Sequence, residues 1–554
     1  MSGADEGAIR YRGRRLRPRP GDTLSQAIAR TGLAERDRSV RYHRPRAPFC
    51  GVGYCTNCLV RVNGRPNVRA CRYVPAPGDS VEVENAWPSP GFDVLAVFDR
   101  LFPRGIDTLR GFRRPRWAVP AYQRVVRRLA GFGRLADPSA SAPGRDGEDR
   151  ETDLLIVGSG ASGGTLSRSL AIGRRRTLLV DRGRLPTSLP GVEVLDRTMV
   201  VFLPPPDPSD PFGFHALAVR DGAQGIRIRA REVAVAVGGY DAGLLFAGND
   251  RPGVVTADGA EALAPETDRP GFRRAVVFGA GARCAGLLER WGAFVEAVVA
   301  PGPVGPDVVR RASELDIPIY PRTMIVEAVG ARAVRAVRLA RRGGADVVRI
   351  PCDAVVLAHR RMPHPQLFFQ AGAQMVWQSQ AGGYFPRLTD RLETSVPGLY
   401  AVGEAAGFAG SEAADSGRRL GAILSGSDPA PSLAPGPPRP SGPHELEGYY
   451  RELLPHLPKR TKTIACACED VLLGELSEAS ERGYRGIEVV KRYTGLGTGL
   501  CQGRYCLPDA ILLLSIWEDR GPNEVGYITQ RPPVVPTALS ALAGLPDSPR
   551  AGRP

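Results

Sequence analysis

Four cysteines lie close together near the start of the chain, in the stretch FCGVGYCTNCLVRVNGRPNVRAC at residues 49–71. Cys50, Cys55, Cys58 and Cys71 have the spacing C-x4-C-x2-C, and twelve residues separate the third cysteine from the fourth. Plant-type [2Fe–2S] clusters are held by thiolates with this spacing. The stretch therefore predicts the ligand set of such a cluster, and its glycines let the backbone turn around what the cysteines hold.

The residues around these cysteines mix short β-like runs with turn residues and one helical pattern, TLSQAIARTG. This mixture predicts a small β-grasp, ferredoxin-like domain over residues 1–90. Residues 91–150 are expected to form a helical connector and a linker. The connector is an arginine-rich amphipathic stretch with two predicted helices at 92–136, and the linker is DPSASAPGRDGEDR at 137–150.

The length and charge of the chain narrow its class. A chain of 554 residues is too long for one hydrophobic core, so we expect several domains. Its formal charge of +16 comes mainly from arginines spread along the chain without interleaved aromatic side chains, which argues against nucleic-acid binding. The N-terminus is charged and no run of eighteen apolar residues occurs, so no secretory signal or transmembrane segment is expected. We therefore expect a cytoplasmic protein, either free or held at the inner membrane through a complex.

A strand, a glycine turn and a helix are predicted in succession from residue 153, in DLLIVGSGASGG. The three spaced glycines provide the tight turn, the close approach of backbone to a pyrophosphate and the helix–strand contact of a dinucleotide site. The next strand ends at Asp181, where a carboxylate is expected to bind a ribose hydroxyl. The predicted contacts of the turn are Gly158, Gly160, Ala161, Ser162 and Gly163.

Two later stretches favour FAD over NAD at this first site, which the glycine turn alone does not separate. VAVAVGGY contains Gly238, and SVPGLYAVGEAAG is predicted to be a strand that delivers Gly403 and Glu404. In flavoproteins with two dinucleotide-binding domains, such a late element closes over the ribityl chain and phosphate of the flavin.

A second strand, turn and helix begin at residue 274, in RAVVFGAGARCAG. Gly279 and Gly281 keep the turn, but Cys284 stands where a third small residue belongs and Ala300 where the acid belongs. NAD(P) binding there is left open, and the alternative is a nucleotide fold that has lost its ligand. Two such units predict an α/β chain: a two-dinucleotide-binding-domain flavoprotein, Rossmann-like and doubly wound.

Four more of the ten cysteines lie near the C-terminus, in CACED and CQGRYC. Cys466, Cys468, Cys501 and Cys506 are spaced C-x-C, thirty-two intervening residues, C-x4-C. Four thiolates in two close pairs can hold either a [2Fe–2S] cluster or a tetrahedral zinc ion. The neighbouring glycines favour the cluster, because they let backbone amides turn toward sulfide.

No catalytic residue is evident from the sequence. The six histidines show no HxxxH pairing and no obvious dyad with an acid or a cysteine, and the chain has no nucleophile elbow or P-loop. The chain is therefore equipped for electron transfer rather than for proton abstraction. The remaining expected domains are the FAD-binding domain at 151–270 and 371–426, an NAD-like domain at 271–370, a proline-rich linker at 427–461, a BFD-like [2Fe–2S] domain at 462–520 and a tail at 521–554.

In this order the motifs resemble the α subunit of heterotetrameric sarcosine oxidase and its relatives, the amino-acid, proline and opine dehydrogenase complexes and hydrogen cyanide synthase. The resemblance covers residues 9–136, 152–425 and 462–545. It implies that an amine or imino acid is oxidised on a separate β subunit with its own FAD, and that an FMN lies near the subunit interface. The motifs that carry it are FCGVGYCTNC, ENAWPSPGFDVLAVFDRLF, LLIVGSGASGG, CACEDVLLGEL, GLGTGLCQGRYC and TQRPPVVPTALSALAG.

Two departures from sarcosine oxidase matter. This chain keeps all four N-terminal cluster cysteines, which the α subunits of that enzyme typically replace, and it has no aminomethyltransferase-like domain. The dehydrogenase-type complexes and hydrogen cyanide synthase therefore fit it better.

The leading hypothesis is the electron-transfer subunit of a multi-subunit, FAD-dependent amino-acid, imino-acid or opine dehydrogenase. Its two [2Fe–2S] clusters would be the ends of a relay, with flavin chemistry between them and a quinone or cytochrome as acceptor. One rival is a self-contained NAD(P)H-dependent reductase, and the other is a zinc-stabilised scaffold subunit.

Overall fold

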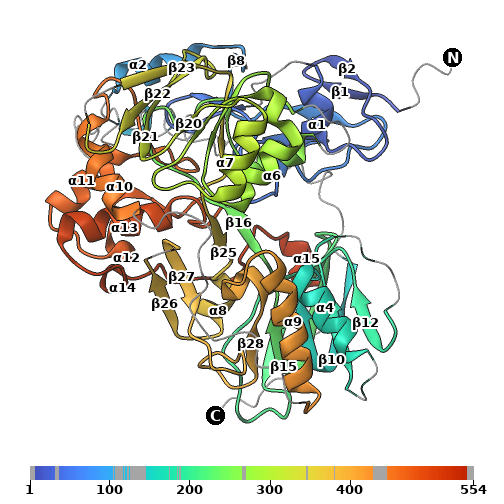
Figure 1. The fold of residues 1–554 in the computed structure, drawn as a ribbon. Coiled ribbons are helices and arrows are strands. Elements are labelled where there is room, and N and C mark those ends of the chain that lie inside the picture. Colours follow the sequence, from blue (N-terminus) through green and yellow to red (C-terminus); the bar gives the residue numbers. More distant parts are fainter. Residues whose placement is uncertain are drawn as a thin grey trace. The chain divides into compact units, whose positions relative to one another are not determined.

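The computed structural model consists of two compact units, drawn in Figure 1. The first unit takes its residues from Met1–Ser141, Asp241–Arg360 and Gly442–Ile528, and the second from Ala142–Tyr240, Arg361–Ser441 and Thr529–Pro554. Each unit is described by itself below. The structure describes residues 7–31, 37–103, 105, 117, 119–121, 124, 145–171, 173, 175–183, 185, 189–264, 270–344, 347–379, 381–427 and 446–545.

The first unit opens with a five-stranded sheet in the order β2-β1-β7-β5-β6. β1 pairs in parallel with β7 and all other neighbours are antiparallel, which is the β-grasp arrangement expected from the sequence. Helix α1 (Leu24–Ala29) begins at Thr23, whose side chain forms a capping box with Gln26. Ile9, Tyr11 and Val81 are buried beneath it. The strands are β1 (Ile9–Tyr11), β2 (Arg14–Leu16), β5 (Leu59–Val62), β6 (Arg65–Arg69) and β7 (Ser80–Glu82).

A second, fully parallel sheet of the first unit has the order β17-β24-β18-β19-β20. Its strands are short apolar runs such as AVVF in β18 and AVVL in β24, and both are completely buried, as strands covered on two faces must be. We expected residues 241–270 to belong to the FAD-binding domain. Instead, β17 is a strand of this sheet and α5 packs against β17 and β24. The elements are β17 (Val254–Thr256), α5 (Ala257–Leu263), β18 (Ala275–Phe278), α6 (Ala282–Trp291), β19 (Val295–Val299), α7 (Pro306–Glu314), β20 (Ile319–Tyr320) and β24 (Ala354–Leu357).

The C-terminal part of the first unit is mainly helical. Helix α10 (Leu446–Leu453) lies inside the stretch 427–461 that we expected to be a linker, and Tyr449 and Tyr450 bury its apolar face. Residues 428–445 of that stretch lie outside the described residues. The further elements of this part are β29 (Ile464–Cys466), β30 (Val471–Leu472), α11 (Leu473–Glu481), α12 (Ile487–Thr494), α13 (Leu507–Glu518) and α14 (Pro522–Val525). The first unit also contains an antiparallel sheet of β21 (Thr323–Val329), β22 (Ala336–Arg341) and β23 (Val347–Pro351).

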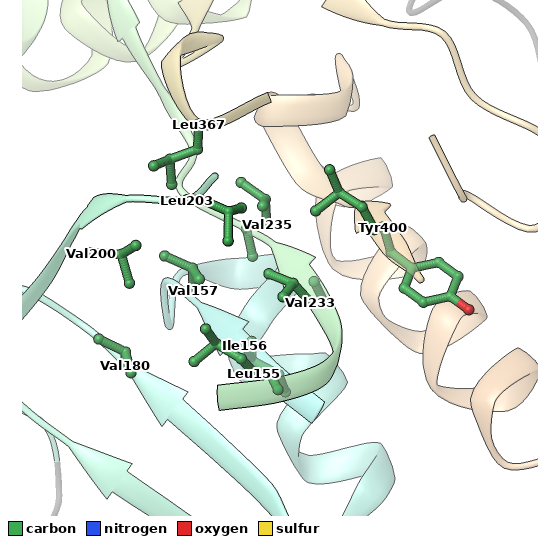
Figure 2. Close-up of a cluster of buried hydrophobic side chains, with 14 of the residues drawn as sticks. Leu155, Ile156, Val157, Val180, Val200, Leu203, Val233, Val235, Leu367 and Tyr400 are labelled. Atoms are coloured by element: carbon green, nitrogen blue, oxygen red, sulfur yellow. The ribbon is translucent and has the colours of Figure 1, made fainter. Parts of the chain in front are cut away.

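The second unit is built on a seven-stranded sheet in the order β12-β11-β10-β15-β14-β13, with β28 paired to β15. Figure 2 shows part of its core, to which β10 contributes Ile156 and Val157, β11 contributes Val180 and β15 contributes Val235. Helices α4 and α9 pack together where Gly417 and Gly421 let them approach closely. The elements are β10 (Arg145–Val157), α4 (Ala161–Leu170), β11 (Thr177–Val180), β12 (Val192–Leu195), β13 (Thr198–Phe202), β14 (Phe214–Arg220), β15 (Gln224–Val235), α8 (Gln366–Gln370), β26 (Met375–Gln378), β27 (Gly383–Pro386), β28 (Leu399–Ala401), α9 (Ser411–Leu424) and α15 (Leu539–Ala543).

The linker expected at residues 137–150 and the two connector helices expected at residues 92–136 are found only in part. β10 begins at Arg145, inside the expected linker, because residues 145–152 pair with β15. Of the two predicted connector helices, the first is found as η1 (Val94–Ala96) and α2 (Val97–Leu101), and the second lies mostly outside the described residues. None of the helices in the described ranges combines the length and apolar character that a bilayer crossing requires.

Candidate functional site

The N-terminal cysteines come together in a loop of the β-grasp domain. Cys50, Cys55, Cys58 and Cys71 are all at most 6% exposed. Hydrogen bonds link the sulfur of Cys50 to those of Cys55 and Cys71, and the sulfur of Cys71 to that of Cys58. The four thiols predicted from the spacing are therefore neighbours, and the two pairs Cys50–Cys55 and Cys58–Cys71 match the two thiolates that each iron of a [2Fe–2S] cluster requires.

Backbone amides also point at these sulfurs. The N–H of Cys55 donates to the Cys50 sulfur at 3.3 Å. Burial opposes ionisation of Cys50, but these hydrogen bonds, with those from the Cys55 and Cys71 thiols, bring its pKa well below the ordinary thiol value. A thiolate is the form that binds iron. N–H···S bonds of this kind also tune the potential of a bound cluster.

The cysteine loop rests against helix α5. The carbonyl oxygen of Phe49 accepts the N–H of Thr256 at 3.1 Å. Gly51 has φ +63°, and a Cβ there would collide with Ala262, while a Cβ on Gly259 would collide with the Phe49 carbonyl. The glycines therefore allow the loop and the helix to approach to backbone contact, so that the cysteine site and the second nucleotide fold form one packed body.

The C-terminal cysteines form a second cluster of thiols. Cys466 ends β29, and Cys506 directly precedes α13. Hydrogen bonds link the sulfur of Cys466 to those of Cys468 and Cys506, and that of Cys468 to that of Cys501. Three of the four residues are buried, and Cys468 is half-buried.

Glycines shape this second site as the sequence predicted. The backbone amides of Gly497 and Glu469 donate to the Cys466 sulfur, and hydrogen bonds from the Cys468 and Cys506 thiols act with them to lower its pKa well below the usual value. A Cβ on Gly499 would collide with Cys468. Among the described residues, no group of three or more His, Cys, Asp and Glu side chains is placed to hold a single metal ion. A [2Fe–2S] cluster makes a different demand, because its two irons each bind one pair of sulfurs.

The two cysteine sites face one cavity. Its volume is about 60 Å³ and all its lining residues belong to the first unit. Cys55 lines it on one side, and the four C-terminal cysteines line it on the other. Cysteines of both sites therefore line the same cavity. The expectation that flavin chemistry lies between the two clusters stays a prediction. The remaining lining residues include Phe49, Asn57, Leu244, Asn249, Asp250, Tyr505 and Asp509.

The first glycine turn joins β10 to α4 in the second unit. A Cβ on Gly158 would collide with the carbonyl of Ala236, and a Cβ on Gly163 with the carbonyl of Gly158. Gly160 is different, because a Cβ there meets no protein atom within 4 Å and its φ is −60°. The backbone at Gly160, before the first turn of α4, is therefore open, as a dinucleotide site requires, and binding of a pyrophosphate there stays a prediction.

Asp181 stands at the end of β11, as expected. Its carboxylate accepts the backbone N–H of Ser159 at 2.7 Å and that of Gly183 at 2.6 Å. Through its bond to Ser159, the Asp181 carboxylate therefore holds the backbone of the glycine turn in place. Its binding to a ribose hydroxyl stays a prediction.

Glu404 has a partner that the sequence did not reveal. Arg361 donates to both its carboxylate oxygens, at 2.6 and 3.0 Å, and the N–H of Gly239 donates to one of them at 2.9 Å. Gly403 has φ +66° and a Cβ there would collide with the Ser162 side chain, so the late element closes directly on the glycine turn. Gly238, with φ +69°, lies beside the same carboxylate.

The second glycine turn has the shape of a nucleotide site without its acid. A Cβ on Gly279 would meet the carbonyl of Ala358 at 2.5 Å, and Gly281 caps α6. Ala300 follows β19 and is fully buried. Near the start of α6, Arg283 forms ion pairs with the carboxylates of Asp241, Asp258 and Glu261. Cys284 is buried against the core of this fold, and burial raises the pKa of its thiol to about 12.

Two of the described histidines lie beside a carboxylate, His43 beside Asp93 and, at a partly exposed position, His215 beside Asp210 at 3.2 Å. His43 Nδ1 lies 2.8 Å from the Asp93 carboxylate, and both side chains are buried. Asp93 also accepts the backbone amides of Trp87 and Leu95, so the pair holds the turn that contains β8 (Pro88–Ser89) and β9 (Phe92–Asp93). Fifty residues separate His43 from Asp93 in the chain, and no local pattern marks the pairing.

Comparisons with known proteins agree with this organisation. Residues 7–86 match the family described as a 2Fe-2S iron-sulfur cluster binding domain, and residues 460–545 match the sarcosine oxidase A3 domain. The computed structure is similar to the crystal structure of L-proline dehydrogenase from P. horikoshii, with a TM-score of 0.66 over 97% of both chains at 18% identity, a likeness of fold.

Three curated relatives span different parts of the chain. The alpha subunit of sarcosine oxidase from Rhizobium meliloti is 28% identical over 96% of this chain and 57% of its own length. An opine oxidase subunit from Agrobacterium tumefaciens is 29% identical over 40% of this chain and 47% of its own length. The HcnA subunit of hydrogen cyanide synthase from Pseudomonas aeruginosa is 35% identical over 14% of this chain and 73% of its own length. The chain thus spans about half the length of the first two. With these matches, the chain belongs to the family of sarcosine oxidase alpha subunits, opine oxidase subunits and hydrogen cyanide synthase subunits.

Proposed function

We propose that this chain is the FAD-containing, iron–sulfur electron-transfer subunit of a multi-subunit dehydrogenase that oxidises an amino acid, imino acid or opine. The observation that carries the proposal is the presence of two buried four-cysteine sites together with an open glycine turn of the dinucleotide type. The enzyme acts on CH–NH or CH–NH2 donors. The amine is oxidised on a partner β subunit that resembles a FAD-dependent amine oxidase.

FAD is the cofactor proposed for the second unit. Gly160 leaves the space that a pyrophosphate needs, and Gly403 and Glu404 close the same turn from the other side. FAD supplies two-electron chemistry when it is bound. The protein's part is to bind its phosphates at the start of α4 and to shield the turn with the Arg361–Glu404 pair.

Two [2Fe–2S] clusters are proposed for the first unit, one at each cysteine site. Iron–sulfur clusters take up one electron at a time, so they suit a one-electron route from flavin to a quinone or cytochrome. The partner subunit, an FMN at the interface with it, and location in the cytoplasm or at the inner membrane through the complex are part of the same proposal.

The second nucleotide fold is proposed to be structural rather than a site for NAD(P). Ala300 stands where the ribose-binding acid belongs, and carboxylates surround Arg283 near the start of α6. Negative charge near a helix N-terminus disfavours a second phosphate there.

The proposal is tested by coexpressing the full chain with an amine-oxidase-like flavoprotein encoded beside it. Anaerobic addition of proline, hydroxyproline, sarcosine or an opine should bleach flavin and produce the electron paramagnetic resonance (EPR) signals of reduced [2Fe–2S] clusters. The partner should be required for both changes. Rapid bleaching of the isolated chain by NADH would instead identify a self-contained reductase, and zinc without iron would identify a scaffold subunit.

A further inference from the structure

We propose that the two cysteine sites form one electron-exchange pair, in which an electron passes directly from one to the other across the cavity that both line. The inference rests on the proposed function, because it requires a cluster at each site. In the step, one electron leaves the reduced site and enters the oxidised site. No bond is made or broken and no proton moves.

The first observation is a buried clamp beside the cavity. Arg46 lies four residues before Cys50, and its Nη2 donates to the carbonyl oxygen of Ala467, between Cys466 and Cys468, at 2.9 Å. The same guanidinium forms an ion pair with Asp470, and both side chains are at most 4% exposed. A buried arginine–carboxylate pair holds its two segments together more firmly than a surface pair does. Separating the partners would leave a buried charge without compensation, which costs free energy.

Asp470 extends this clamp to the turn at Arg41, nine residues before Cys50. Its other carboxylate oxygen accepts the backbone N–H of Arg41 at 2.8 Å. The residue has φ +50°, a left-handed conformation that a short polar side chain tolerates when it bonds locally. One aspartate thus joins the backbone just after Cys468 to the segment that leads into Cys50.

The second observation is a set of ring contacts on the cysteine loops themselves. The Arg504 guanidinium lies 4.7 Å from the centre of the Tyr54 ring, and Tyr54 precedes Cys55. Arg504 also donates to the carbonyl oxygen of Cys501 at 3.0 Å, and it is 4% exposed. Phe49 and Tyr505 meet edge to face with ring centres 5.3 Å apart. Residues adjacent to Cys50 and Cys55 therefore touch Arg504 and Tyr505, in the loop between Cys501 and Cys506.

The third observation is that most of the cysteines that line the cavity are buried. Cys55, Cys466, Cys501 and Cys506 are each at most 6% exposed, and Cys468 is half-buried. Burial of the cysteines limits the number of water molecules that must reorient when charge moves, and close packing keeps the separation of the two sites constant. The Arg46–Asp470 clamp, the ring contacts between the cysteine loops and the burial of the cysteines together favour direct electron exchange between the two sites. The alternative is that each site passes electrons along a separate path.

The test is EPR spectroscopy of the full chain reduced anaerobically with dithionite. It is compared with C58S and C501S, each of which should retain one cluster and half of the iron. If the sites are a close pair, the wild-type signals are split or broadened and relax faster than the sum of the two variants' signals, because two neighbouring unpaired spins interact. A wild-type spectrum equal to that sum overturns the inference while the proposed function stands.

A second measurement needs no variant. During stepwise reduction of the wild-type chain, the signal of the first-reduced cluster should change shape as the second cluster becomes paramagnetic. A signal that only grows, without changing shape, overturns the inference. If C501S keeps the full iron content of the wild-type chain, no cluster occupies the C-terminal site, and both the inference and the proposed second cluster are rejected.

Discussion

Arg361 binds both carboxylate oxygens of Glu404, and through that carboxylate it holds the loop at Gly239. We expect R361A to lower the amount of FAD that copurifies with the chain, because the closing element loses its anchor while the glycine turn remains. The measurement is the flavin-to-protein ratio by absorbance. R227A is the matched control, since Arg227 of β15 pairs bidentately with Asp149 of β10 in the same unit, eight residues before the end of β10. Equal flavin loss in both variants would contradict a specific role.

Gly160 and Gly163 separate ligand binding from folding. G160V adds a side chain into space that holds no protein atom, at a φ that any residue adopts, so the fold should persist and FAD should be lost. G163A drives a methyl group into the Gly158 carbonyl, so it should lower the melting temperature. Flavin content and thermal unfolding are measured for both variants. G271V, where a Cβ also meets open space, serves as the control. Unchanged flavin in G160V would refute the site.

Cys58 should belong to the iron-binding set, and Cys284 should not. C58S is expected to remove half of the iron and one EPR signal while FAD stays bound, because the cluster site and the glycine turn belong to different units. C284S replaces an equally buried thiol in an apolar core and should leave the iron content unchanged. Iron and flavin are quantified in the same preparations. Loss of flavin together with iron in C58S would contradict this division.

Asp37 should make stability depend on pH near neutrality. Burial raises the pKa of its carboxyl to about 7, against hydrogen bonds from the Asn85 backbone that lower it. The folded state therefore binds a proton that the unfolded chain releases at lower pH, so stability should fall as pH rises from about 4 to about 7, by at most ~1.4 kcal/mol per pH unit. Urea unfolding across this range should show a weaker slope in D37N.

Asp250 provides the comparison for that titration. Burial favours the neutral form of its carboxyl, but the Arg44 guanidinium holds its pKa at about 2. A depressed carboxyl pKa stabilises the folded state above the unfolded value and loses that contribution only in acid. D250N should therefore be destabilised by the same amount from pH 5 to pH 8. A pH-dependent loss in D250N, or an unchanged slope in D37N, would contradict these assignments.

The sequence predicted correctly those elements whose conformation is determined by residues that are close together in the chain. Short apolar runs predicted β10, β11 and β18, and the glycine turns that follow β10 and β18 were found at residues 158 and 279. The cysteine spacings predicted two groups of thiols, and both groups are neighbours in space. These features succeed because the period of a strand, the φ of a glycine and the reach of a cysteine loop are fixed within a few residues.

Pairings between distant segments were not predictable in this way. Arg361 lies 43 residues from Glu404, and Arg46 lies 421 residues from Ala467. Nothing in the sequence near Arg46 distinguishes it from the other arginines of an arginine-rich chain, so its burial depends on which domain packs against it. The same reason explains why the membership of residues 241–270 and the shared cavity of the two cysteine sites emerged only from the structure.

Arg504 should set the reduction potential of the C-terminal cluster. Its buried guanidinium lies next to Cys501, and a fixed positive charge stabilises the reduced cluster, which carries one more negative charge than the oxidised one. R504Q should lower the midpoint potential measured by EPR-monitored redox titration. R504K should preserve more of it, since the charge remains while the planar contact with Tyr54 is lost. R492Q removes a charge that is 72% exposed and screened by water, so it should leave the potential unchanged. An unchanged potential in R504Q would show that the guanidinium does not act on the cluster and only positions the loop.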